Sequence, residues 1–247
     1  MHLRRNLKDG LLIIYAFNNP VKFTDPTGMG PDDIIKIKNN GSIQRTKTNN
    51  NFDILTNESG KRSIKIAHKD GKSQIGKIQT QDTRGSETQY MLISDNKVAR
   101  KVFEFAASTT FNEDSNAEFG LDRFSFSDGY SVNLFQTGGL SDKTLPHVIP
   151  LGQIGSIDLG NGHLIQDSNW IENNHSHPGN FSYLTPSGFE RRFENGGPVF
   201  VPAGNYGDRG AMSRAQPNKQ YLYGKDLEGI NYIEYTRESV KIIGNRK

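Results

Sequence analysis

Cysteine is absent from this chain of 247 residues. Its absence excludes disulfide bonds, thiolate nucleophiles and every metal site that uses a thiolate ligand. It also excludes the zinc-dependent nucleobase deaminases, because cysteine holds the zinc ion in those enzymes. A metal ion in this protein must therefore be held by histidine and carboxylate side chains.

Long apolar runs are also lacking. Hydrophobic residues make up 33% of the chain, and the mean hydropathy is −0.67. No run approaches the roughly 18–20 apolar residues of a membrane helix, so we expect no membrane segment. The apolar stretch from Leu11 to Phe17 follows basic residues, as in a signal peptide, but it is short and no small-residue cleavage site follows it. We therefore expect a strand there and no signal peptide.

An excess of one charge is the third feature that is missing. Thirty Lys and Arg residues nearly balance 27 Asp and Glu residues, which leaves a formal net charge of +3. No stretch shows the clustering of Lys and Arg that is typical of nucleic-acid-binding proteins. We therefore expect no nucleic acid among the partners of this protein.

Glycine, by contrast, is abundant, with 26 residues, and short alternating segments lie between turn residues. This composition is typical of a loop-rich chain with many short strands rather than of a helical bundle. Turn signals at Asn39 to Gly41, Asn57 to Gly60 and Asp128 to Gly129 predict connections between strands. One helix is predicted from Asn96 to Ala107, because apolar residues recur there at helical spacing.

The main signal for chemistry in the sequence is a pair of histidines one residue apart, His175 and His177. They follow a run that is predicted to be a strand, and on an extended chain residues i and i+2 face the same side. Their Cβ atoms would then lie roughly 6–7 Å apart at a rise of about 3.3 Å per residue. One zinc ion, with Zn–N bonds of about 2.0–2.1 Å, can bridge that span. Pro178 is expected to end the strand, because it has no N–H for the ladder.

A short motif near the start, from Tyr15 to Met29, carries a resemblance to a known family. Asn18-Asn19-Pro20 and Asp25-Pro26-Thr27-Gly28 occur at the spacing that closes the conserved shell of RHS/YD-repeat polymorphic toxins, with Ile13 in place of the first Tyr of that signature. In that family a variable toxin domain follows the motif. The resemblance therefore implies that residues 1–29 are a remnant of the shell and that a toxin module follows.

The order of polar residues in the second half resembles the JAB/MPN (JAMM-type) zinc metallopeptidases, and in particular the JAB-like toxin domains that follow RHS shells. The resemblance is carried by Glu118, by His175-Ser176-His177-Pro178, by Ser187 and by an Asp at a helix start, Asp208. It implies an α+β or α/β fold, a mixed β-sheet with flanking helices, in residues 96–247. Residues 30–95 are expected to form a hairpin-rich spacer or an appended β region.

The resemblance also implies roles. Zinc would be bound by His175, His177 and a carboxylate, Glu118 would act as general base, and Ser187 would stabilise the oxyanion. Asp208 is favoured as the third ligand because the family presents an Asp that opens a helix of small residues. Glu190, three residues after Ser187, remains the alternative, because a carboxylate of either length can bind zinc.

The function implied is a zinc-dependent peptidase or isopeptidase effector that is secreted or delivered, acts on a protein in the cytoplasm of a target cell and is neutralised by a cognate immunity protein. Two alternatives stay open: a metal-dependent nuclease toxin, and a non-enzymatic or decayed toxin module. Asp122 and Asp226 are expected at the surface, whereas four tyrosines near the C-terminus are expected to line a sheet: Tyr221, Tyr223, Tyr232 and Tyr235.

Overall fold

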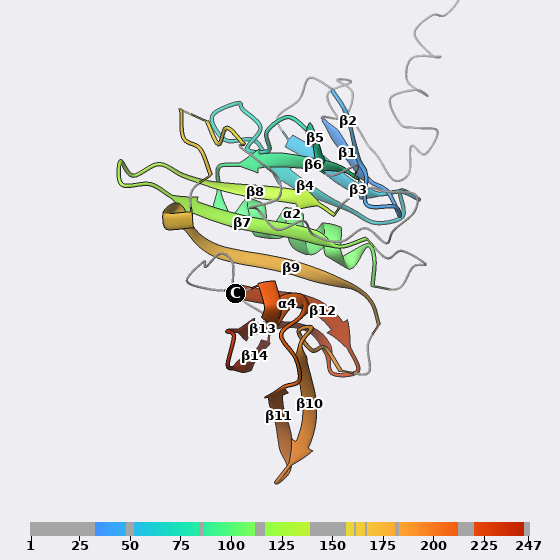
Figure 1. Cartoon of the computed structure of the whole chain (residues 1–247). Helices are drawn as coiled ribbons and strands as arrows, with labels where there is room; N and C mark the ends of the chain where they lie inside the picture. The colour runs from blue at the N-terminus through green and yellow to red at the C-terminus, as the bar shows by residue number, and fades with distance from the viewer. Residues whose placement is uncertain are drawn as a thin grey trace, which may run out of the picture.

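A mixed sheet of eight strands forms the centre of the molecule (Figure 1). The computed structural model describes residues 33–47, 52–83, 86–111, 117–138, 157–160, 162–165, 167–180, 183–211 and 220–244. The remnant expected in residues 1–29 lies outside these ranges. The order of strands across the sheet is β14-β13-β12-β9-β7-β8-β6-β5, and only β9 and β12 run parallel. The strands are β5 (Gln79–Thr83), β6 (Ser86–Ile93), β7 (Phe119–Ser125), β8 (Ser131–Thr137), β9 (Trp170–Asn180), β12 (Gln220–Asp226), β13 (Gly229–Tyr235) and β14 (Val240–Gly244).

A smaller sheet of four strands has the order β2-β1-β3-β4. Its strands are β1 (Ile34–Ile37), β2 (Ile43–Thr46), β3 (Phe52–Asn57) and β4 (Ser63–Ala67). The turns predicted at Asn39 to Gly41 and at Asn57 to Gly60 connect β1 to β2 and β3 to β4, and each contains a glycine with positive φ. The central sheet, however, includes β5 and β6, so it does not divide at the boundary that the sequence suggested between residues 95 and 96.

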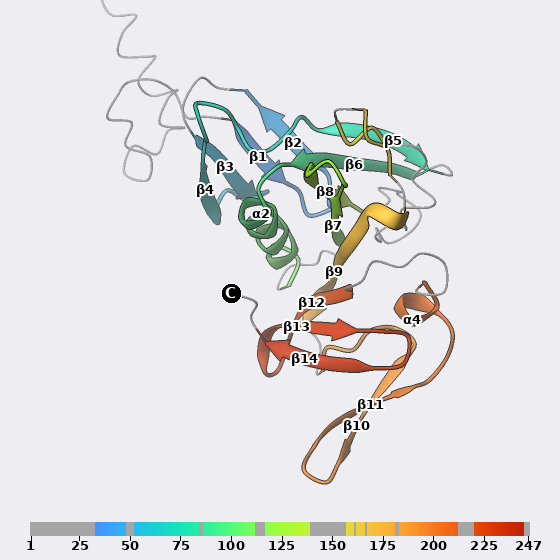
Figure 2. The same ribbon diagram turned by 90° about the vertical axis from the view of Figure 1, so that its left-hand side faces the viewer.

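Helix α2 (Asn96–Ser108) follows the prediction within one residue. The carboxylate of Asp95 caps its N-terminus by accepting hydrogen bonds from the N–H groups of Lys97 and Val98, at 2.8 and 2.9 Å. The helix contacts β7 and β8 of the central sheet and β3 of the small sheet, so it lies where the two sheets meet (Figure 2). Its buried face belongs to the largest apolar cluster, whose other members include Ile35, Leu55, Phe119, Leu121, Phe135 and Tyr232.

A two-stranded ribbon, β10 (Phe189–Glu194) and β11 (Gly197–Pro202), projects from the body on the side away from the small sheet (Figures 1 and 2). It occupies a stretch after the histidines that is rich in glycine and proline. After the ribbon comes α4 (Gly207–Ala211), a helix of five residues. A single 3-10 turn, Asp167–Asn169, leads into β9.

The fold is therefore mostly β, with mixed sheets, and belongs broadly to the α+β class. The expectation of a mixed sheet is confirmed, but the described residues contain only two short helices, α2 and α4, so flanking helices are few. The tyrosines near the C-terminus line the sheet, as expected. No helix in the described part of the chain is long and apolar enough to cross a membrane.

Candidate metal centre

Strand β9 carries both histidines in the middle of the central sheet. His175 lies opposite Gly120 of β7 on one side and Leu222 of β12 on the other. The expectation that Pro178 ends the strand is wrong, since β9 runs on to Asn180. The reason is a bulge: the pairing with β12 is regular up to Ser176 and resumes only at Asn180. Pro178 lies inside this irregularity, where no ladder N–H is required.

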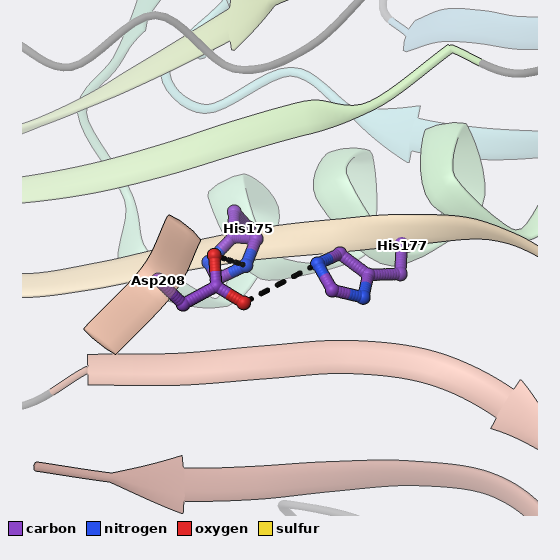
Figure 3. Close-up of side chains that lie close together, drawn as sticks. All are labelled: His175, His177 and Asp208. Atoms are coloured by element: carbon purple, nitrogen blue, oxygen red, sulfur yellow. Dashed lines mark ion pairs between the residues drawn. The ribbon is translucent and has the colours of Figure 1, made fainter. Parts of the chain in front are cut away.

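Asp208, at the start of α4, completes a group with His175 and His177 (Figure 3). His175 Nε2 lies 3.1 Å from Asp208 Oδ1, and His177 Nε2 lies 3.4 Å from Asp208 Oδ2. One ligand atom from each of the three side chains lies within 4.8 Å of the other two. Two atoms bound to one tetrahedral zinc ion at about 2.0–2.1 Å are about 3.3–3.4 Å apart. The two His–Asp separations, each to a different oxygen of Asp208, are close to that value.

The Nε2 atom of His175 provides a second test of the fit. His175 is 7% exposed, and its Nε2 is buried without a hydrogen-bond partner among the described residues. The contact with Asp208 therefore has the distance of an ion pair but not the direction of a hydrogen bond. Buried polar atoms without a partner are rare in proteins. An ion between the two side chains would use this lone pair, so the three side chains could hold a metal ion.

The charges in the group reinforce one another. Burial lowers the pKa of His175, but the charge of Asp208 and the weaker fields of Glu118 and Asp122 outweigh it, so the pKa is raised. Burial raises the pKa of Asp208, yet the two imidazoles hold it well below its ordinary value. Asp208 is thus an anion that favours a cation beside it, either an imidazolium or a metal ion.

Ser187 lies against Asp208, and the contact runs through its main chain. The Ser187 N–H donates a hydrogen bond to Asp208 Oδ2 at 2.6 Å, and the Arg209 N–H donates one to the Ser187 carbonyl at 3.0 Å. Gly207 has a φ of 55°, and a Cβ there would lie 2.3 Å from the Ser187 Cβ. Only glycine permits this close approach, which aims the carboxylate of Asp208 at the histidines.

Glu118 precedes β7 directly and lies near the same group. Because Gly120 is opposite His175 in an antiparallel pair, an extended chain two residues earlier puts Glu118 on the same sheet face as His175. Its charge contributes to the raised pKa of His175. The N–H of Phe119 donates to Ser176 Oγ at 2.9 Å, which ties the start of β7 to the centre of β9.

Glu190, the alternative third ligand, lies away from this group. It is on β10, its side chain is 54% exposed, and it pairs with Arg192 at 2.9 Å. Of the two carboxylates that the sequence left open, the structure therefore brings Asp208 to the histidines and not Glu190.

Two further residues at the site have roles that the sequence did not suggest. Tyr235, on β13, is 3% exposed and its Oη lies 3.4 Å from His175 Nδ1. Asp122 was expected at the surface, which is wrong, because its side chain is fully buried. The burial of Asp122 could have been predicted from the alternation of Gly120, Asp122 and Phe124. Residues two apart on a strand share a face, so Asp122 lies on the same face as Phe124.

The Asp122 carboxylate accepts three hydrogen bonds: from Asn173 Nδ2 at 2.7 Å, from Gln136 Nε2 at 2.9 Å and from Trp170 Nε1 at 3.0 Å. Burial nevertheless raises its pKa to about 6. Asp226 is also buried, contrary to expectation, and accepts a hydrogen bond from the Leu184 N–H at 3.0 Å. Both carboxylates replace lost hydration with fixed donors.

Comparison of the chain with protein-family models, curated proteins and solved structures gives no match. The chemistry of this site therefore has to be inferred from its side chains and from the two motif resemblances in the sequence.

Proposed function

We propose that this protein binds one zinc ion through His175, His177 and Asp208 and hydrolyses a peptide or isopeptide bond. The observation that carries the proposal is the convergence of the three ligand atoms around a buried His175 Nε2 that has no hydrogen-bond partner in the described part of the chain. Two imidazoles and one carboxylate are a ligand set of catalytic zinc sites, and such a set leaves a fourth position open for water. Absence of cysteine fits the same class of site.

The proposed chemistry uses residues on three elements. Zinc, when bound, lowers the pKa of a coordinated water to about 7. Glu118 takes a proton from the attacking water and returns it to the leaving amine. The Ser187 N–H holds Asp208 in place, and the Ser187 hydroxyl is the proposed donor to the oxyanion of the tetrahedral intermediate. Tyr235 orients the His175 ring through Nδ1, as partners of metal-bound histidines commonly do.

The substrate class and the biological setting rest on the resemblances. A mixed sheet with Glu118, the histidine pair and Asp208 in this order supports a JAB/MPN-like arrangement. The RHS-type motif up to Met29 supports an effector module that acts in a target cell and meets a cognate immunity protein. The proposed protein substrate follows from the JAB/MPN-like arrangement.

The first experiment measures zinc by elemental analysis in the wild type and in three variants, after reconstitution and removal of free metal. About one zinc ion per chain is expected in the wild type. His175→Ala and Asp208→Ala are expected to lose it, because each removes one of three protein ligands. Glu190→Ala is the matched carboxylate control and should retain the full content. Wild-type protein without zinc would overturn the proposal.

The second experiment separates metal binding from catalysis. Glu118→Gln is expected to retain zinc and to lose about 10²–10⁴-fold in the rate of peptide hydrolysis, since it lacks the base. Hydrolysis is followed with quenched-fluorescence peptides and with isopeptide-linked substrates. Metal-dependent cleavage of DNA, with no cleavage of either kind of peptide, would instead favour the nuclease alternative.

A further inference from the structure

The ribbon formed by β10 and β11 is a preformed hairpin with a defined register. Asn195 and Gly196 form its two-residue loop, with φ angles of 48° and 85°, as in the type I′ turn that suits the twist of paired strands. Glu194 pairs with Gly197 across this loop, and the pairing continues regularly to Phe189 and Pro202. A two-residue loop makes Glu194 and Gly197 a hydrogen-bonded pair, and such pairs then recur at every second position.

The two outer edges of the ribbon differ because of this register. Residues 198, 200 and 202 of β11 turn their main-chain groups outward, away from β10. Two of these three are Pro198 and Pro202, which have no N–H, so Phe200 alone offers an outward donor. Proline on an outer edge is a device by which proteins prevent another strand from pairing there.

The outer edge of β10 contains no proline. Its outward residues are Phe189, Arg191 and Phe193. The N–H of Phe189 donates to the Pro186 carbonyl at 3.2 Å. The register directs the N–H and C=O groups of Arg191 and Phe193 outward, away from β11. Within the described ranges of the chain, no third strand pairs with β10. One edge of the ribbon is thus closed and the other is open.

The open edge is held in an extended conformation by the side chains beneath it. The Arg191 guanidinium lies over the rings of Tyr183, Phe193 and Phe200, at 4.6, 5.3 and 5.6 Å from their centroids. Its Nη2 lies 3.1 Å from Oε1 of Glu228, in the turn between β12 and β13. A two-stranded ribbon alone is marginally stable, so these contacts preorganise it.

The open edge begins beside the candidate metal centre. Phe189, the first residue of β10, follows Ser187 by two residues, and Ser187 holds Asp208 through its N–H. Gly188, between them, packs so closely that a Cβ there would lie 2.6 Å from the Tyr206 carbonyl oxygen and 2.8 Å from the Arg209 Cβ. The base of the ribbon and the loop that carries Asp208 are therefore one packed unit.

From these observations we infer that the outer edge of β10 binds an extended segment of a polypeptide substrate, which adds to the ribbon as a third strand. The main-chain groups of Arg191 and Phe193 supply hydrogen bonds that do not depend on the sequence of the segment. The rings of Phe193 and Tyr183, 56% and 43% exposed, contact its side chains. The inference rests on the proposed function, because it names the form in which a protein substrate reaches the zinc site.

A matched pair of variants tests the edge. Phe193→Pro removes the outward N–H of β10 without removing a hydrogen bond between β10 and β11, as Pro198 does on the other strand. Phe193→Ala removes the same ring and keeps the N–H. Binding of fluorescein-labelled unfolded casein is measured by anisotropy in chelator, so that no cleavage occurs. Phe193→Pro is expected to bind at least 10-fold more weakly than Phe193→Ala. Equal binding by the two variants would overturn the inference.

Hydrogen exchange on the wild type gives a second test that needs no variant. Casein is expected to slow the exchange of the Arg191 and Phe193 amides and to leave the Phe200 amide unchanged. Protection of both edges or of neither contradicts the inference. Protection that depends on protein concentration without casein would make a second copy of the chain the occupant and would also overturn it.

These outcomes are independent of the zinc chemistry. If unfolded casein binds along β10 but zinc is absent, the proposed hydrolase fails and the binding edge stands. If zinc binds and short peptides are cleaved but Phe193→Pro and Phe193→Ala bind casein equally, the hydrolase stands and the edge fails.

Discussion

The two faces of the central sheet have opposite chemistry, although the same strands build both. Toward α2 the strands present apolar and aromatic side chains, such as Leu121, Phe135 and Tyr232. On the other face the middle of the sheet carries Gly120, Asp122 and His175. Two small apolar clusters flank this polar row, one around Phe124, Leu134 and Trp170 and the other around Leu184, Leu222 and Ile233.

The difference shows how a polar row is kept inside a β protein. The face toward α2 is stabilised by burial of apolar area, which needs no direction. The polar face instead needs a partner for each group, because an unsatisfied buried polar atom costs free energy. Asp122 meets this need with three donors, whereas His175 Nε2 does not meet it within the described residues. Two buried atoms of this row have no hydrogen-bond partner among the described residues, Gln136 Oε1 and His175 Nε2. The histidine nitrogen is the one that we assign to a metal ion, because it faces the carboxylate of Asp208.

The largest expected effect on stability comes from truncating an aromatic side chain in the core between α2 and the central sheet. Phe103 of α2 is fully buried and lies 5.6 Å from the Tyr223 ring. Phe103→Ala is expected to lower the free energy of unfolding by about 3–5 kcal/mol, because it removes apolar contacts and leaves a cavity. Urea denaturation of the metal-free protein measures this free energy of unfolding. Lys101→Ala, at an exposed position of the same helix, is the control and should change stability by less than about 0.5 kcal/mol.

The polar face should respond to pH through Asp122. Its pKa is about 6 in the folded protein, above the ordinary value of 3.8, so the folded state holds this proton more tightly than the unfolded state. Stability from this group is therefore present below about pH 4 and is lost as the pH rises through 6, by roughly 2–3 kcal/mol. In Asp122→Asn this loss should disappear.

The measurement is the difference in unfolding free energy between wild type and Asp122→Asn, determined in chelator at several values from pH 4 to 7. The variant also changes the hydrogen bonds to Asn173, Gln136 and Trp170, which adds an offset that does not depend on pH. A difference that stays constant across this range would contradict the assignment of a raised pKa to Asp122.

A smaller effect is expected from Tyr235, which supports the site from β13. Tyr235→Phe removes the hydroxyl near His175 Nδ1 and should weaken zinc binding by about 10-fold, the lower end of the usual range because the 3.4 Å contact is long. Competition with a chromophoric chelator measures the affinity for zinc. Tyr223→Phe makes the same change on the opposite face of the sheet and should leave zinc affinity unchanged.

Much of the fold could be predicted because it depends on local rules. Helix α2 follows from apolar spacing, and the turns around Asn40, Asn57 and Asp128 follow from residues that favour tight turns. The ribbon was missed because Gly196, Pro198 and Pro202 suggest a loop. Pairing across the Asn195-Gly196 turn makes a hairpin of it, with its prolines on an outer edge.

The sequence by itself determined that any metal would be held by histidine and carboxylate, and that His175 and His177 would face one side, because strand periodicity acts over two residues. The tertiary structure decided which carboxylate joins them. Asp208 and Glu190 are equivalent as ligands, and no local rule separates them. Asp208 reaches the histidines because Gly207 packs against Ser187, while pairing with β11 directs Glu190 to the surface. The meeting of Asp208 with the histidines joins segments more than thirty residues apart, whereas the position of Glu190 follows from the register of the β10–β11 hairpin.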